Sequence, residues 1–129
     1  MQEIGLEAEI LGREKELQDV LVKKVKDVIP SIKNVDKAKK LDRELLNMNN
    51  KQLIDALIEN IIEVKCIKPS FIMNQPIIMS PLAKTHAQGR TCGSPFLAER
   101  FELFINRMEI INSYSEQNDE SLQRQGFSL

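Results

Sequence analysis

The chain has 129 residues and a net charge of −1, with 42% apolar and 29% charged residues. This composition is typical of a soluble globular domain and excludes an intrinsically disordered chain. No run of about 18 apolar residues occurs, so we expect no membrane span, and the near-neutral charge gives no general attraction to nucleic acid. The N-terminus has neither a secretory nor a transit pattern. The two cysteines of the chain, Cys66 and Cys92, form no C-x-x-C pair. We therefore expect a cytoplasmic protein, with a mitochondrial location left open.

The N-terminal half has the three- and four-residue apolar spacing of helices. A first helix is predicted over residues 7–29 and ends at Pro30, because the residue before a proline avoids the α region. Asn49 and Asn50 interrupt the pattern, and a further helix is predicted over residues 51–64. Residues 1–50 are therefore predicted to be a helical segment of unknown role, in which two helices pack together.

Part of this segment is locally basic, and its cations are Lys33, Lys37, Lys39, Lys40 and Arg43. An RNA-contacting helix is one interpretation. A solvated helix face, balanced by the neighbouring acidic residues, is the favoured one.

Prolines divide the second half, residues 51–129, into short β-like runs. Strands are predicted over residues 70–73 and 76–79, on either side of a turn at Asn74 and Gln75. Residues 87–94 form a small polar loop. We predict a mixed helical and strand-containing domain in this half.

A hairpin is predicted next, with strands over residues 101–106 and 108–116 and a turn at Asn106 and Arg107. A short helix begun by Asp119 follows it. The strands of this hairpin carry most of the residues that suggest chemistry.

Glu102 and Glu109 lie on opposite strands of the predicted hairpin. If the turn pairs Phe104 with Glu109, both carboxylates lie on one face of the sheet. Magnesium prefers such hard oxygen ligands, together with phosphate oxygens of a substrate. Solvated glutamates on an exposed strand face give the same pattern, so these two residues alone do not distinguish a magnesium site from a solvent-exposed strand.

Asn112, Tyr114 and Glu116 alternate along the second strand and therefore share a face. A carboxylate can pair with an alkylammonium group, an aromatic ring can cover its methylenes, and an amide can bind a carboxylate or an amine. This set would select lysine over neutral amino acids. A polar outer strand face fits equally well.

Simple alternation puts Glu109 on the face opposite Asn112, Tyr114 and Glu116. One site can use all of them only if the strand changes parity between Glu109 and Asn112. We therefore predict a β-bulge near Ile110 and Ile111.

Two segments resemble the class II lysyl-tRNA synthetases, within a match that runs from about residue 53 to 127. They are residues 68–84, KPSFIMNQPIIMSPLAK, and residues 99–127, ERFELFINRMEIINSYSEQNDESLQRQGF. Aspartyl and asparaginyl types share the preceding glutamates, whereas the N-x-Y-x-E-x-N-D continuation favours lysine. The resemblance implies an α+β fold, namely part of the class II antiparallel sheet with flanking helices.

The resemblance also implies binding sites for ATP, Mg²⁺ and lysine on the hairpin. Glu102 and Glu109 would hold Mg²⁺ and ATP, with Asn112 near the phosphates and the lysine. Tyr114 would lie against the lysine stem and Glu116 would meet its ammonium group. Arg100 occupies an arginine position of the family, and we expect no catalytic role for it.

The implied function is ATP-dependent activation of lysine and its transfer to tRNA. Residues 1–129 show no second or third class II motif and no anticodon-binding barrel, and the family's usual leucine is replaced by Gln117. We therefore expect weak activity from the chain alone, and either homodimerisation or association with the remaining synthetase parts. The alternatives are a non-catalytic helical interaction protein built on a synthetase remnant and a relative that lysylates a protein.

Overall fold

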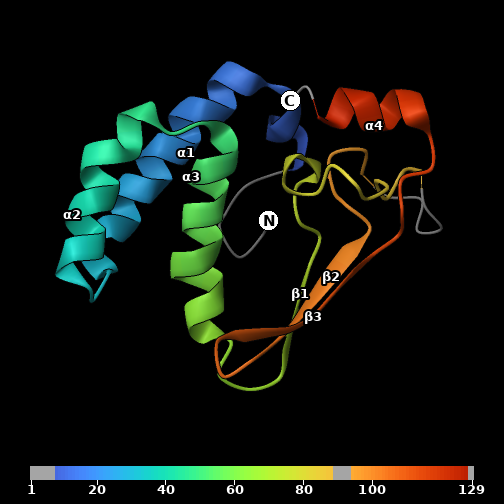
Figure 1. The fold of residues 1–129 in the computed structure, drawn as a ribbon. Coiled ribbons are helices and arrows are strands. Elements are labelled where there is room, and N and C mark those ends of the chain that lie inside the picture. The colour runs from blue at the N-terminus through green and yellow to red at the C-terminus, as the bar shows by residue number, and fades with distance from the viewer. Residues whose placement is uncertain (1–7, 89–93, 128–129) are drawn as a thin grey trace.

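The computed structural model describes residues 8–88 and 94–127 and places a group of helices beside a small antiparallel sheet (Figure 1). The predicted α+β class is confirmed. None of the described helices is both long and apolar enough to cross a membrane. The predicted loop at residues 87–94 lies mostly outside the described residues.

The first predicted helix is shorter than expected. A 3-10 turn, Ala8–Gly12, precedes helix α1, Glu14–Val28, and a second 3-10 turn, Ile29–Ser31, contains Pro30. Leu17, Leu21 and Val25 form the buried face of α1, at the spacing that the sequence predicted.

Helix α2, Val35–Glu44, carries the basic stretch and has no buried residue. It begins at Asn34, whose side chain accepts a hydrogen bond from the Lys37 backbone N–H, and Lys37 also pairs with Glu59 at 2.5 Å. A 3-10 turn, Leu45–Asn47, follows it. These features agree with the favoured interpretation of a solvated helix face.

Helix α3, Asn50–Leu57, begins with a capping box in which Asn49 and Gln52 bond to each other's backbone N–H groups. The predicted helix 51–64 is therefore present but is not uniform. It continues as a π-helical segment, Ile58–Ile62, and a 3-10 turn, Glu63–Lys65. π-Helical segments are uncommon and are frequent at functional sites.

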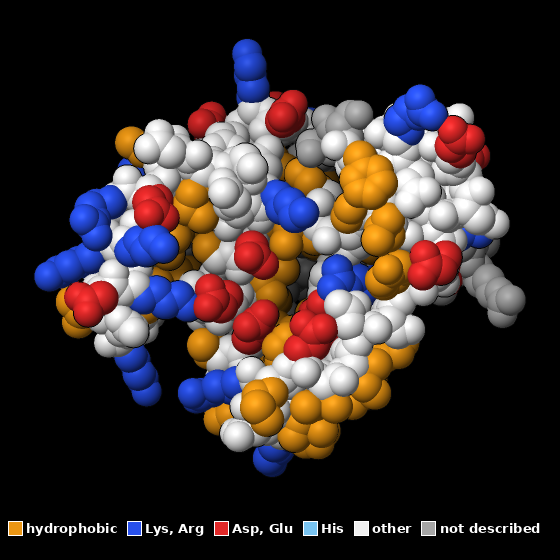
Figure 2. All heavy atoms as spheres, in the orientation of Figure 1, with side chains coloured by type: hydrophobic (Ala, Val, Ile, Leu, Met, Phe, Trp, Pro, Cys, Tyr) orange, Lys and Arg blue, Asp and Glu red, His pale blue; other side chains and the backbone are white. Residues whose placement is uncertain are grey.

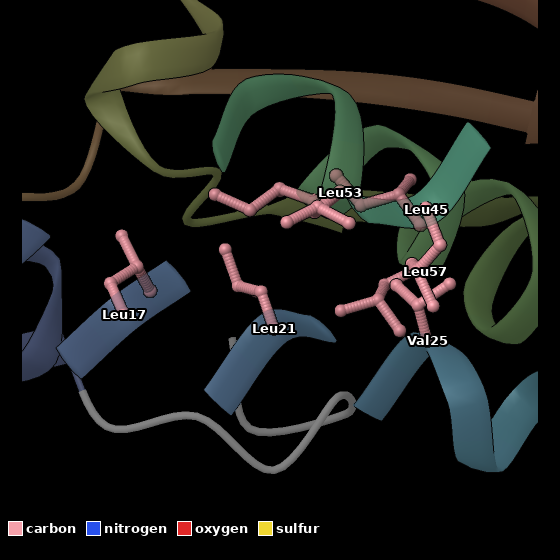
Figure 3. Close-up of a cluster of buried hydrophobic side chains, with 8 residues drawn as sticks. Leu17, Leu21, Val25, Leu45, Leu53 and Leu57 are labelled. Carbon is pink, nitrogen blue, oxygen red and sulfur yellow. The ribbon is translucent and has the colours of Figure 1, made fainter. Parts of the chain in front are cut away.

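The main hydrophobic core lies between α1 and α3, where their leucines point toward one another (Figure 3). Its buried members are Leu17, Leu21, Val25, Leu45, Leu53, Ile54, Leu57 and Ile58. α2 contributes only the half-buried Leu41 to this core, so the packing between the two helices of residues 1–50 is limited and α1 packs mainly against α3. The physical reason is that α3 presents a wider apolar face to α1 than α2 does. The core thus contains residues from both sides of position 50.

The sheet has strands β1, Ser70–Met73, β2, Arg100–Ile105, and β3, Met108–Tyr114, in the order β1-β2-β3. Asn106 and Arg107 form the predicted turn, with φ angles of 51° and 63° that suit a type I′ hairpin. Their backbone N–H groups donate to Ile67 and Cys66. The hairpin tip is thereby tied to the segment that follows α3.

The predicted strand at residues 76–79 is wrong. Asn74 has a φ of 56° and turns the chain, and Ile77–Met79 forms a 3-10 turn. Only Pro76 forms a bridge, with Leu97. Proline has no N–H to give to a ladder, which explains why pairing stops there.

Helix α4, Glu120–Gly126, begins where it was predicted, because the Asp119 side chain accepts a hydrogen bond from the Leu122 backbone N–H. It follows the sheet along the chain (Figure 1).

The two faces of the sheet differ in exposure. Toward the helices, Ile72 and Phe104 are buried with Cys66 and contact Ile62. The opposite face carries exposed apolar side chains that appear along the lower edge of the molecule in Figure 2. We call it the outer sheet face, and its strongly exposed members are Phe71, Met73, Met108 and Ile111.

We expect the 129-residue chain to self-associate through the outer sheet face, because contiguous exposed apolar surface and open strand edges favour association. The double substitution Met108→Lys/Ile111→Lys should shift the chain toward the monomer in sedimentation velocity experiments over a concentration series. Leu46→Lys is the matched control, because Leu46 is 76% exposed but lies in the helical part. A wild-type chain that stays monomeric at every concentration contradicts this expectation.

Candidate functional site

The hairpin contains the predicted irregularity. Leu103 pairs with Ile111, whereas the next residue, Phe104, pairs with Glu109. Ile110 is therefore an extra residue in β3 without a partner on β2, which is the defining feature of a β-bulge. The predicted bulge near Ile110 and Ile111 is confirmed.

The bulge brings the predicted polar residues of the hairpin to one face of the sheet. Residues opposite each other in an antiparallel pair point to the same side. Glu102 is opposite Asn112, and Arg100 is opposite Tyr114. Glu109, opposite Phe104, lies on this face as well. We call this the polar sheet face.

A partly buried guanidinium group connects the side chains of the polar sheet face. Arg100 donates from Nη2 to Glu102 Oε1, from Nε to Asn112 Oδ1 at 3.0 Å, and from Nη1 to Ser80 Oγ at 2.6 Å. Its side chain is only 14% exposed. Arg100 thus joins three separate segments of the chain at one point.

Glu102 is the most buried of the predicted site residues, at 7% exposure. Its second oxygen, Oε2, accepts a hydrogen bond of 2.7 Å from Gln75 Nε2. Both oxygens therefore have protein donors, and the negative charge is paired with Arg100. Removal of one partner of such a buried pair generally costs about 3–5 kcal/mol, because an unpaired charge remains.

A further carboxylate faces this pair from the helical part. Glu63, in the 3-10 turn after α3, has a pKa raised above its ordinary value near 4.5, first by burial and then by the nearby carboxylates. Those carboxylates belong to Glu59, Glu102, Asp55 and Glu109. Figure 2 shows acidic side chains gathered over α3 and its continuation toward the hairpin. The mutual repulsion identifies a locally acidic region that favours a cation.

The donor types of this region suit a divalent cation, but the region does not enclose one. Within residues 8–88 and 94–127, no group of three or more His, Cys, Asp or Glu side chains is close enough to hold a metal. A hard cation bound by one or two carboxylates takes its remaining ligands from water and from substrate phosphates. Glu102 and Glu109 fit that limited role.

Tyr114 and Glu116 lie differently. Tyr114 is half-buried on the polar sheet face, whereas Glu116 is exposed beyond the end of β3, where it forms a bridge with Ala83. The adjoining backbone is held by Lys84, whose N–H donates to Ser115 at 2.8 Å. The structure therefore orders the strand end that carries Glu116 without covering its carboxylate.

A groove elsewhere on the molecule does not involve these residues. It runs between α2 and α3 and is lined by Lys37, Lys40, Met48 and Asp55, among others. None of the predicted site residues lines it.

Sequence reasoning missed the partners of the predicted residues. Arg100 was expected to have no catalytic role, yet its position two residues before Glu102 places it on the same face, and this parity was a usable signal. Gln75, Ser80 and Glu63 come from turns, whose side-chain directions do not follow a strand or helix period. No signal in the sequence identified them.

Comparison with known proteins assigns the chain to a family. The family model described as "tRNA synthetases class II (D, K and N)" matches residues 2–129. The chain belongs to the class II tRNA synthetases. The match includes residues 1–50 almost entirely, for which the sequence patterns gave only helices.

The similar curated proteins are lysine–tRNA ligases. The chain is 38% identical over 124 residues to the probable cytoplasmic lysine–tRNA ligase of Encephalitozoon cuniculi. The matched region is 96% of this chain and 21% of that protein. The chain is 45% identical over 78 residues to the probable cytoplasmic enzyme of Vairimorpha ceranae, covering 60% of this chain and 14% of that protein. It is 39% identical over 101 residues to the lysine–tRNA ligase of Aquifex aeolicus, covering 74% and 16%.

These matches confirm the predicted resemblance to part of a class II lysyl-tRNA synthetase. The chain spans between 14% and 21% of the length of these three relatives.

The buried ion pair gives a stability prediction. Arg100→Met should lower the free energy of unfolding by about 3–5 kcal/mol, because Glu102 is left buried without its counter-ion. The double variant Arg100→Met/Glu102→Met should recover most of this loss, since two apolar side chains leave no buried charge. Urea unfolding measures both changes.

The exposed pair between Arg124 and Glu120 is the control, with side chains 79% and 87% exposed. Arg124→Met should cost less than about 1 kcal/mol. Equal losses at Arg100 and Arg124 contradict a buried electrostatic role for Arg100.

The raised pKa of Glu63 predicts a pH dependence. In the window between the ordinary pKa near 4.5 and the higher folded pKa, the native state binds more protons than the unfolded state, so stability falls as pH rises. Glu63→Gln removes this loss and should be more stable than wild type at pH 7, with the difference shrinking below pH 4.5. Urea midpoints across pH test it, and a Glu63→Gln variant that is less stable at pH 7 refutes it.

Proposed function

We propose that this chain is part of a lysine–tRNA ligase and that the polar sheet face binds lysine and ATP with Mg²⁺. In the proposed reaction, the lysine carboxylate attacks the α-phosphate of ATP, which gives lysyl-adenylate and pyrophosphate. The lysyl group then passes to the terminal ribose of tRNA. The observation that carries the proposal is the bulge at Ile110, because it brings the two carboxylates, the amide and the tyrosine to one face.

For Mg²⁺ and ATP, the proposed ligands are Glu102 and Glu109. The raised pKa of Glu63 supports them, since after burial its causes are repulsion by nearby carboxylates that include Glu102 and Glu109. A bound magnesium ion would supply neutralisation of phosphate charge. Glu109 is exposed and Glu102 is anchored by Arg100 and Gln75, so one ligand is free to adjust while the other is fixed.

For lysine, the proposed contacts are Asn112, Tyr114 and Glu116. The half-buried ring of Tyr114 offers an apolar surface for methylenes, and the exposed carboxylate of Glu116 is available to an ammonium group. Pairing a desolvated ammonium avoids the cost of burying an unpaired charge. This difference would separate lysine from a neutral amino acid of the same length.

The names of the relatives support the same assignment, because two of the three reported above are described as cytoplasmic lysine–tRNA ligases. We accordingly propose a cytoplasmic location, with tRNA as the acceptor.

Glu116→Gln should weaken the binding of lysine about tenfold while leaving that of norleucine, which lacks the side-chain ammonium group, unchanged, because only lysine loses a charge-assisted hydrogen bond. Isothermal titration of the 129-residue chain with both amino acids measures this selectivity.

Glu120→Gln is the matched control, since Glu120 is an exposed glutamate of α4. It should not change the ratio between lysine and norleucine. The proposal fails if wild type binds norleucine as well as lysine.

A further inference from the structure

We propose that Arg100 is a positioning residue that turns the Asn112 amide so that its N–H2 group, and not its carbonyl, faces the ligand. Asn112 would then bind an anionic oxygen. The choice of lysine and ATP as the ligands rests on the proposed function, whereas the orientation of the amide does not.

The orientation follows from the chemistry of the two groups. A guanidinium group donates hydrogen bonds and has no acceptor. The contact of 3.0 Å from Arg100 Nε therefore requires the carbonyl oxygen of Asn112 on the arginine side. Because an amide is planar with its two ends opposed, the N–H2 group points away from Arg100. Asn112 is exposed, so this donor is open to a ligand.

Arg100 can impose this orientation because it is fixed itself. Its other two nitrogens donate to Ser80 Oγ, at 2.6 Å, and to Glu102 Oε1, and its side chain is 14% exposed. Ser80 is buried, and Glu102 is held in turn by Gln75. An asparagine on an open strand would otherwise be free to present either end of its amide.

The surroundings make this donor distinctive. Glu102 and Glu109, which share the face, offer only acceptors when ionised. The N–H2 group adds a neutral donor between an acidic region that attracts cations and the ring of Tyr114. With its carbonyl engaged by Arg100, Asn112 offers the ligand only a donor, which suits an acceptor oxygen such as that of the amino-acid carboxylate or of a nucleotide phosphate.

The test compares each ligand with an analogue that lacks its anionic group in the 129-residue chain: lysine with lysinamide, which has no carboxylate, and ATP with adenosine, which has no phosphate. Asn112→Leu should lower the preference for the anionic form about tenfold in one of the two pairs, since a charge-assisted hydrogen bond is lost. Arg100→Lys, which keeps the charge but loses the planar fork, should lower the same preference. The pair that responds identifies the source of the anion.

A purely structural role for Arg100 predicts a different result. In that case Arg100→Lys would weaken the binding of each ligand and of its analogue to the same extent. Its effect would then add to that of Asn112→Leu. We expect instead that the double variant Arg100→Lys/Asn112→Leu lowers the ligand preference no more than Asn112→Leu alone, because both changes remove the same hydrogen bond. Ser113→Ala is the control, as Ser113 is exposed on the other face of β3 and should change neither preference.

The side-chain amide resonances of Asn112 give a second measurement that needs no Arg100 variant. In wild type they should shift with the ligand that carries the carboxylate or phosphates and not with the analogue that lacks them. The inference is overturned if both forms shift them equally, or if Asn112→Leu leaves both preferences unchanged. If one of these two results is found while wild type still prefers lysine to norleucine, only the inference about Arg100 and Asn112 is overturned. If wild type does not prefer lysine to norleucine but its preference for ATP over adenosine depends on Asn112, only the proposal of lysine binding is overturned.

Discussion

The extra residue in β3 determines which side chains of the hairpin can act together. Without Ile110 as a bulge, Glu109 would lie on the outer sheet face among exposed apolar side chains, away from Glu102. With it, the strand changes parity once, between Glu109 and Asn112. A bulge adds local twist and interrupts the ladder, and such features are frequent next to functional sites because they redirect side chains. In this chain the redirected side chain is a carboxylate, and it joins an acidic region.

The acidic region is stable because one cation is buried within it. Glu102 repels the carboxylate of Glu63, and burial of its own charge is unfavourable. Arg100 offsets both costs, and its remaining donors satisfy Ser80 and Asn112. A buried charge pair is not by itself strongly stabilising. Its value here is geometric, since it fixes a carboxylate and an amide from neighbouring strands relative to each other.

Much of this arrangement was predictable from the sequence, and the rest has a physical explanation. The turn at Asn106 and Arg107 could be predicted because it separates two β-like runs. The bulge could be predicted because a single site that uses both Glu109 and Asn112 requires one change of parity between them. The strand predicted over residues 76–79 is wrong. Its apolar residues fit a strand, but Pro76 has no N–H to donate and the ladder ends there. The parity of Arg100 with Glu102 was visible in the sequence, but its bonds to Ser80 and Asn112 were missed because residues from a turn and from a neighbouring strand have no fixed spacing along the chain.

The helices influence the site through the position of Glu63. The core between α1 and α3 fixes α3, and the π-helical segment after it changes the direction in which the following side chains point. Ile62 contacts the buried residues under the sheet, and Glu63 next to it faces the carboxylates of the hairpin. Apolar packing and electrostatic repulsion therefore act on adjacent residues of one segment. The packing holds Glu63 close to Glu102 despite the repulsion, which leaves a region of negative charge that a cation from the ligand would relieve.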